Sequence, residues 1–164
     1  MRNRGSALLE TLLVTPLLVV LVFGGMEFAK ATLTYYQLHK ALRGGARMAA
    51  LLRGADFCSA EDAQIAALKN FIVFGPDGTV EPVVRGLEAG RILLTPERLD
   101  AENASVGTCD CTGPAGCGLS EGGRAPDYVV AEVDGGYEFE LAIPFRTPET
   151  IFLRPRVRAA FGGY

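Results

Sequence analysis

A long, predominantly apolar run lies near the N-terminus of the chain. From Ser6 to Met26 the only charged residue is Glu10. A helix of this length rises about 30 Å, which matches the hydrocarbon core of a bilayer. A body of this size would also struggle to enclose a helix that is apolar on all sides. The pattern therefore predicts a membrane-spanning helix over 6–26, with a buried core helix as the alternative.

The helical pattern continues beyond the apolar run. No proline occurs between Leu17 and Leu52, and 27–53 is rich in Ala and Leu, which favour helix. We therefore expect a stalk helix over 27–53. A bend is expected at Gly44–Gly45, because each glycine weakens a helix by roughly 1 kcal/mol relative to alanine.

Two stripes mark the surface of this stalk. Small residues recur every four positions at Ala41, Gly45 and Ala49, a spacing that lets another backbone approach closely. Basic residues at Lys40, Arg43 and Arg47 are three and four apart and form a separate stripe. The small residues predict either a filament-packing face or ordinary packing on the chain's own domain, with a solvated charged face opposite.

A second helix is expected to start at Ser59, with Glu61 and Asp62 in its first turn as capping and dipole partners. Its apolar stripe consists of Ile65, Leu68 and Ile72. The turn residues of 75–78, Gly-Pro-Asp-Gly, end it.

Short strands are expected over 80–85, where Pro82 favours an edge position, and over 91–94. The clearest local pattern is a hairpin. Alternation of apolar and polar residues over 137–143 indicates a half-buried strand. The preceding segment 128–134 is its expected partner, and Asp134-Gly135-Gly136 supplies the turn.

A final strand is expected over 151–161. It places Arg154, Arg156 and Arg158 on one face, either solvated or in contact with an acidic neighbour. Glu138 and Glu140 also share a strand face, but no histidine or metal set accompanies them for acid–base chemistry. His39 is the only histidine and falls in the stalk. The familiar catalytic and phosphate-binding motifs are absent, so no catalytic residue and no cofactor are predicted.

Charge changes the picture only modestly. The formal net charge is −3 and the pI is about 5.2, so the basic face that nucleic-acid binding requires is not indicated. Arg2 and Arg4 precede the apolar run, whereas Lys30, Lys40 and Arg43 follow it. The positive-inside rule is therefore nearly balanced and does not by itself assign the orientation.

Four cysteines lie in the expected body, at Cys58, Cys109, Cys111 and Cys117. In a body outside the cytoplasm they suggest two disulfides, with three possible connectivities. We expect one bond from Cys58 to the loop and one closed within 109–117, with the partners left open. The tight pair Cys109–Cys111 is disfavoured. A thiolate zinc site is the alternative, but C-x-C-x5-C without a nearby histidine is a weak zinc pattern.

Two kinds of processing fit the N-terminus. A secretory signal peptide needs a basic start, an apolar stretch and a small-x-small site, which 29–31 supplies. Glu10 inside the apolar run and Glu27 beside that site speak against it. A cut after Gly5 instead would leave the new α-amine on Ser6, four residues before Glu10. The two charges could then neutralise each other inside lipid; the plainer reading is a Glu10 that reaches the headgroups, favoured by the helix dipole.

The segment Arg4-Gly5-Ser6-Ala7-Leu8-Leu9-Glu10, with Pro16 in the apolar run and Glu27-Phe28 at its end, resembles the TadE/TadG family of Tad-pilus pseudopilins. The resemblance implies cleavage by a prepilin peptidase after Gly5, which places Glu10 at the fifth mature position. It covers roughly 2–52. Ser6 departs from pilins that begin with a methylated phenylalanine, and the body is longer than the major subunit of Tad pili. Both departures favour a minor subunit.

Together these inferences predict an α+β protein similar to type IV pilins, with a long N-terminal helix packed on a small antiparallel sheet and one extra helix. The expected parts are a leader over 1–5, a membrane span over 6–26, a stalk over 27–53 and an extracytoplasmic domain over 54–164. The expected function is assembly or initiation of a Tad-type adhesive pilus from the inner membrane. Partners would be other pilins, pilus assembly proteins, the prepilin peptidase and the bilayer. A secreted disulfide-stabilised binding domain and a membrane-anchored accessory protein outside the filament are the alternatives.

Overall fold

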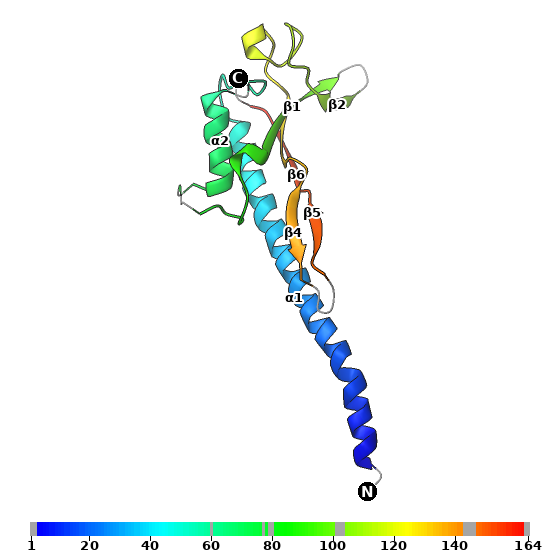
Figure 1. Ribbon diagram of the computed structural model, residues 1–164. Helices are drawn as coiled ribbons and strands as arrows, with labels where there is room; N and C mark the ends of the chain where they lie inside the picture. The colour runs from blue at the N-terminus through cyan, green and yellow to red at the C-terminus, as the bar shows by residue number, and fades with distance from the viewer. Residues whose placement is uncertain are drawn as a thin grey trace.

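The computed structural model describes residues 3–59, 61–76, 78, 81–100, 104–142 and 147–162, with 3–7 described by their backbone. Its dominant element is helix α1, which runs from Asn3 to Ala49. The N-terminal part of α1 projects as a single rod, and the other elements gather along its C-terminal part (Figure 1). The predicted α+β architecture of one long helix, one further α-helix and antiparallel strands is confirmed.

Helix α1 ends at Ala49 rather than near Arg53, and it continues as helix through Gly44 and Gly45. Packing on one side of the helix explains this continuity. Leu42 and Ala46 are fully buried on either side of the glycine pair, so tertiary contacts hold the backbone helical where its own propensity is weak.

Helix α2 spans Ala63–Phe74 and is capped by Asp62, not started by Ser59. The Asp62 carboxylate accepts the backbone N–H groups of Gln64 and Ile65, which the first helical turn leaves without partners. The predicted apolar stripe is buried, and Gly75 ends the helix as expected, with a φ of 75°. Part of the predicted turn, Asp77, lies outside the described residues.

Four strands form the main sheet: β1 (Ile92–Asp100), β2 (Ser105–Thr108), β3 (Tyr128–Val133) and β6 (Arg156–Ala160). All pair antiparallel in the order β2-β1-β3-β6. β1 is longer than the strand predicted over 91–94. The strand predicted over 80–85 is wrong for its described part, 81–85, which is irregular. There, the N–H of Val83 bonds the carbonyl of Val73 at the end of α2.

The hairpin predicted between 128–134 and 137–143 is wrong. The turn forms, with the N–H of Gly136 bonding the carbonyl of Val133, but the two strands it joins lie in different sheets. β3 takes the central position between β1 and β6, because it is apolar on both faces and must be covered on both. β4 (Tyr137–Leu141) pairs instead with β5 (Glu149–Leu153). Ile143, the last residue of the expected alternation, lies outside the described residues.

The single strand predicted over 151–161 is divided into β5 and β6. The break falls at Arg154–Pro155, where the buried Pro155 has no N–H to donate to a ladder. β5 therefore belongs to the two-stranded sheet and β6 to the four-stranded one. The three arginines consequently do not share one strand face.

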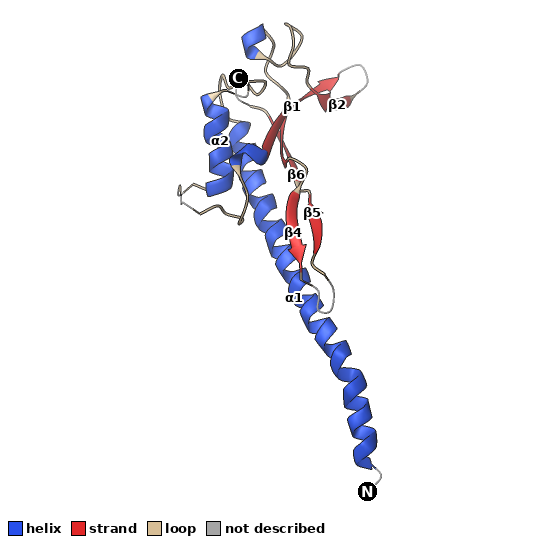
Figure 2. Ribbon diagram, viewed as in Figure 1, coloured by secondary structure: helices blue, strands red, loops and turns tan. Residues whose placement is uncertain are grey.

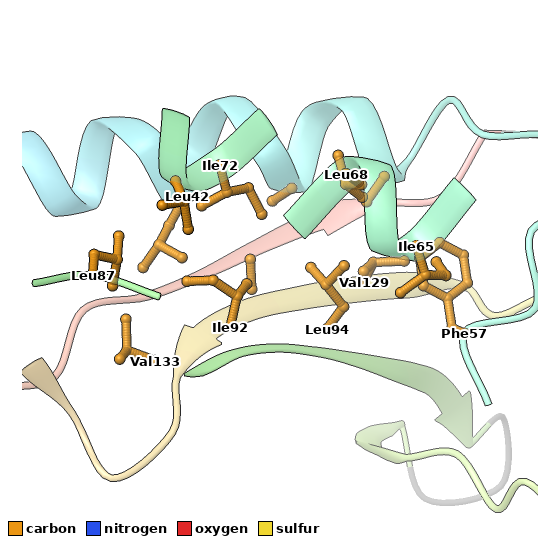
Figure 3. Close-up of a cluster of buried hydrophobic side chains, with 14 of the residues drawn as sticks. Leu42, Phe57, Ile65, Leu68, Ile72, Leu87, Ile92, Leu94, Val129 and Val133 are labelled. Atoms are coloured by element: carbon orange, nitrogen blue, oxygen red, sulfur yellow. The ribbon is translucent and has the colours of Figure 1, made fainter. Parts of the chain in front are cut away.

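The hydrophobic core lies between the two helices and one face of the main sheet (Figure 3). Leu42 of α1 and Ile72 of α2 face Ile92 and Leu94 of β1. Val129 of β3 lies beside Leu94 (Figure 3). The core thus involves only the C-terminal part of α1. Its N-terminal part extends beyond all the strands (Figure 2).

Candidate assembly surface

The projecting part of α1 exposes its apolar side chains on every side. Most large residues between Leu8 and Met26 are exposed, from 43% at Val14 to 74% at Leu13. The most apolar 18-residue window of this helix has a mean hydropathy of 2.2 and none of it is buried. A surface this apolar is unfavourable in water. By length and composition α1 is therefore a candidate membrane anchor, and within the part of the chain that the structure describes it is the one helix that meets this criterion.

Glu10 is an exposed carboxylate within this apolar rod. Among the described residues it makes no ion pair. The backbone places Gly5 and Ser6 in the first turns of the same helix. Ser6 lies four residues before Glu10, which is one turn and about 6 Å along the axis. The structure thus places Ser6 and Glu10 one turn apart at the same end of one helix.

Glu27 marks the point where the strands first reach α1. It is only 8% exposed, and its carboxylate accepts a hydrogen bond of 2.6 Å from Lys30 and one of 3.4 Å from the N–H of Ala142, just after β4. The hydrogen bond from Lys30 holds the pKa of the Glu27 carboxyl below its ordinary value, and burial opposes it. Sequence reasoning used Glu27 only as the end of the apolar run and missed this contact.

The small-residue stripe of α1 packs within the subunit. Gly45 and Ala49 are buried and Ala41 is half-buried. A Cβ on Gly45 would overlap Cγ1 and Cδ1 of Ile72, so α2 crosses α1 where the glycine leaves room. Of the two expected uses of this stripe, packing on the chain's own domain is the one seen. A role in filament packing stays a prediction.

Two disulfides staple the body, as expected: Cys58–Cys111 and Cys109–Cys117. The first links the segment between the helices to the loop after β2, and the second closes that loop. Asp56 reinforces the same junction. Its carboxylate accepts the N–H groups of Cys58 and Ser120, while its own N–H bonds the Asp62 carboxylate at 2.9 Å.

The carboxylates of Asp56 and Asp62 are both stabilised in the ionised form. The N–H of Asp56, followed by those of Gln64 and Ile65, holds the pKa of Asp62 below its ordinary value despite some burial. Burial raises the pKa of Asp56, but the hydrogen bonds from Ser120 and Cys58 lower it by more in total. A carboxyl whose pKa is lower in the folded state stabilises the fold above its unfolded pKa and loses that effect as the pH falls through its folded pKa.

Asp62→Ala is therefore expected to lower the free energy of unfolding by about 1 kcal/mol at pH 7, and by less at pH 3. Urea denaturation of the full chain in mild detergent at both pH values measures the two differences. Glu61→Ala is the matched control, because Glu61 is exposed and precedes the cap. An equal loss at both pH values would contradict a role for the ionised carboxylate.

A second charged cluster was missed by sequence reasoning. Glu97 of β1 is 2% exposed, and its Oε1 accepts a hydrogen bond of 2.7 Å from Arg156 of β6. Its Oε2 lies 2.6 Å from Nε of Arg158, an ion-pair distance without hydrogen-bond alignment. Arg156 also approaches Glu132 at 3.5 Å. These arginines therefore pair with a buried carboxylate of their own chain, while their side chains remain 54% and 45% exposed. In the sequence, the close spacing of Arg156 and Arg158 was the sign of this cluster. Their partner, Glu97, is distant in sequence and could not be identified.

Comparison with known protein families finds a match, and it lies within helix α1. Residues 5–47 match the TadE-like protein family. The TadE-like segment includes Gly5, Ser6 and Glu10 and ends two residues before α1 does, so the resemblance seen in the sequence is confirmed there. The match covers 43 of the 164 residues, all of them within α1. Neither the curated proteins nor the solved structures include a match. The body beyond the TadE-like segment is therefore described from its own structure.

Within the described ranges, no three His, Cys, Asp or Glu side chains are grouped so that they could hold a metal ion. All four cysteines are used in the two disulfides, which leaves none for the alternative zinc site.

Proposed function

We propose that this chain is a minor pilin or pseudopilin that takes part in assembly or initiation of a Tad-type adhesive pilus. One observation carries the proposal: the TadE-like segment coincides with the projecting apolar helix, and a single carboxylate, Glu10, lies near its start. The rest of the chain forms a separate stapled body around the other end of that helix (Figure 1). This division suits a subunit that is held by its helix and presents its body outside.

In this proposal, residues 1–5 are a leader that a prepilin peptidase removes after Gly5. Residues 6–26 then span the inner membrane, 27–53 form the stalk, and 54–164 lie outside the cytoplasm. An unpaired carboxylate within lipid costs on the order of a few kcal/mol. The new α-ammonium of Ser6 on a neighbouring subunit offsets this cost at Glu10. The pairing favours insertion of the next subunit beside the last one.

Glu10→Gln is expected to reduce incorporation of this chain into sheared pili by about tenfold or more, because the loss of one charge pair in lipid exceeds the 1.4 kcal/mol that a factor of ten represents. The measurement is the amount of this chain in filaments sheared from the native host, relative to the amount in its membranes.

Mass spectrometry of the mature N-terminus is the control, since both wild type and variant should begin at Ser6. A wild-type start at Thr32 would indicate a secreted domain, and an intact Met1 a plain membrane anchor; either sinks the proposal. Wild-type incorporation by the Gln variant would remove the charge-pairing role of Glu10 alone.

A further inference from the structure

The face of α1 that points away from the body carries one continuous stripe. Its members, spaced three and four residues apart as on one side of a helix, are Leu33, Tyr36, Lys40, Arg43 and Arg47. We call these five residues the outward stripe. Leu33 is 62% and Tyr36 65% exposed, and the three basic residues are exposed as well. Within the described part of the chain, none of the three cations makes an ion pair.

The body that this stripe turns away from has the opposite charge. Residues 54–164 contain 17 acidic and nine basic side chains, a formal charge of −8. The outward stripe carries three positive charges and the chain as a whole has a net charge of −3. The chain is therefore polarised between a basic helix face and an acidic body. Surfaces of opposite charge on one molecule are complementary between copies.

We propose that the outward stripe docks against the β4–β5 hairpin of a second copy of this chain, with Lys40 facing Glu140. This interface rests on the proposed pilus function. Glu140 is exposed and makes no ion pair within the described residues. Glu149 pairs in register with Leu141, the neighbour of Glu140, so Glu149 lies on the opposite face of the hairpin. Glu138, in contrast, already lies 3.6 Å from Arg91.

The stagger between the two copies follows from the contact of Ala142 with Glu27. Glu140 is two residues from Ala142, about 7 Å along the strand, so it lies level with about residue 31 or 32 of its own α1. Lys40 is about 13 Å further along the helix. A neighbour displaced outward by about 13 Å therefore brings Glu140 beside Lys40. Because the two contacting surfaces differ, each copy leaves one of each free, and such a contact propagates into an open filament.

Two other occupants of the outward stripe fit less well. A parallel contact between two outward stripes would bring Lys40, Arg43 and Arg47 against like charges, which is unfavourable. Anionic lipid headgroups are too distant. Lys40 lies 14 residues beyond Met26, about 21 Å along the helix, whereas the Debye length at physiological ionic strength is about 8 Å. The acidic body of a neighbouring copy is the occupant that the charges and the geometry favour.

Zero-length carbodiimide coupling tests this contact with native residues. The reagent joins the Lys40 amine to a carboxylate as an amide and takes up the released water as its urea. Membranes and pili from cells that co-express 14N- and 15N-labelled full-length chain provide mixed pairs. We expect cross-linked peptides that join Lys40 of one isotope to Glu140 of the other. Lys40 links confined to one isotope, or links to other carboxylates only, overturn the proposal.

Charge reversal provides the second readout. Lys40→Glu, and separately Glu140→Lys, should each lower incorporation into sheared pili by about fivefold or more. The two changes together should restore it. Arg53→Glu and Glu121→Lys are matched controls, since both residues are exposed and lie outside the two surfaces. Failure of the combined variant to recover overturns the inference.

If the wild-type chain is absent from pili, the proposed function fails. If it is present in pili but forms no mixed Lys40 link, only this inference fails.

Discussion

Replacing both Cys58 and Cys111 by serine is expected to lower the free energy of unfolding by about 4 kcal/mol. The bond joins residues 53 apart in sequence, and constraint of a loop of that length in the unfolded chain accounts for about 4 kcal/mol in the chain-entropy model. It also ties the segment before α2 to the loop after β2, where little apolar surface is buried. Urea denaturation of the full chain in mild detergent, followed by circular dichroism, measures the change.

The second disulfide provides the matched comparison. Cys109–Cys117 closes a loop with a separation of only eight residues, for which the same model gives about 2.5 kcal/mol. The variant lacking Cys58–Cys111 should therefore be the less stable of the two by about 1.5 kcal/mol. The reverse order would show that local packing of the loop, rather than the length of chain that is closed, decides the stability of this junction.

Gly45→Ala is expected to destabilise the body by up to about 2 kcal/mol. A Cβ there would overlap the side chain of Ile72, which is 1% exposed and surrounded by core residues. Overpacking of this kind costs about 1–3 kcal/mol, and the gain of about 1 kcal/mol in helix propensity offsets part of it. The same denaturation experiment measures the difference.

Gly44→Ala is a demanding control, because it adds the same methyl group to the next residue of the same helix. No atom lies within 4 Å of a Cβ at Gly44, so this change should stabilise the chain by up to about 1 kcal/mol. In a double-mutant cycle, Ile72→Ala should cost less in the Gly45→Ala background than in wild type. Equal effects of the two alanines would show that α2 does not approach α1 as closely as described.

The helices were largely predictable because their signals are local. The apolar run of α1, its lack of interruption and the stripe of α2 all follow from the sequence within a few turns. The boundary errors have local causes too. Ser59 and Asp62 are both good N-cap residues, and the bonds that the N–H groups of Gln64 and Ile65 donate to the Asp62 carboxylate show that Asp62 caps α2. The helix continues through Gly44–Gly45 for a non-local reason, since α2 packs against it there.

The strands were harder to predict, because alternation indicates a strand but not its partner. The turn at Asp134-Gly135-Gly136 was found, yet the strands on either side of it belong to different sheets. What distinguished them was the two-sided apolar character of 128–133, which favours a central position. Pro155 likewise signalled a break within the last strand. The apolar character of 128–133 and the position of Pro155 were both visible in the sequence. Which strands pair with each other depended on segments far along the chain.

The elements of the candidate assembly surface divide in the same way. Gly5, Ser6 and Glu10 were singled out by their resemblance to the TadE/TadG family, and the TadE-like match covers these residues and the apolar run after them. The buried Glu97 with its two arginines, and the contact of Glu27 with Ala142, join residues 59 to 115 positions apart. No local pattern encodes such pairs, because burial of a charge depends on what the rest of the chain places around it.

By itself, then, the sequence determined the long apolar first helix, the existence of the second helix, the cysteines available for two disulfides and the charge difference between residues 1–53 and 54–164. These depend on composition and periodicity over one element. The tertiary structure alone decided that β3 is central and β4 pairs with β5, that Gly45 makes room for Ile72, and that the outward stripe is the face of α1 left uncovered. Each of these is a choice among non-local partners, made by the burial of apolar surface over the whole body.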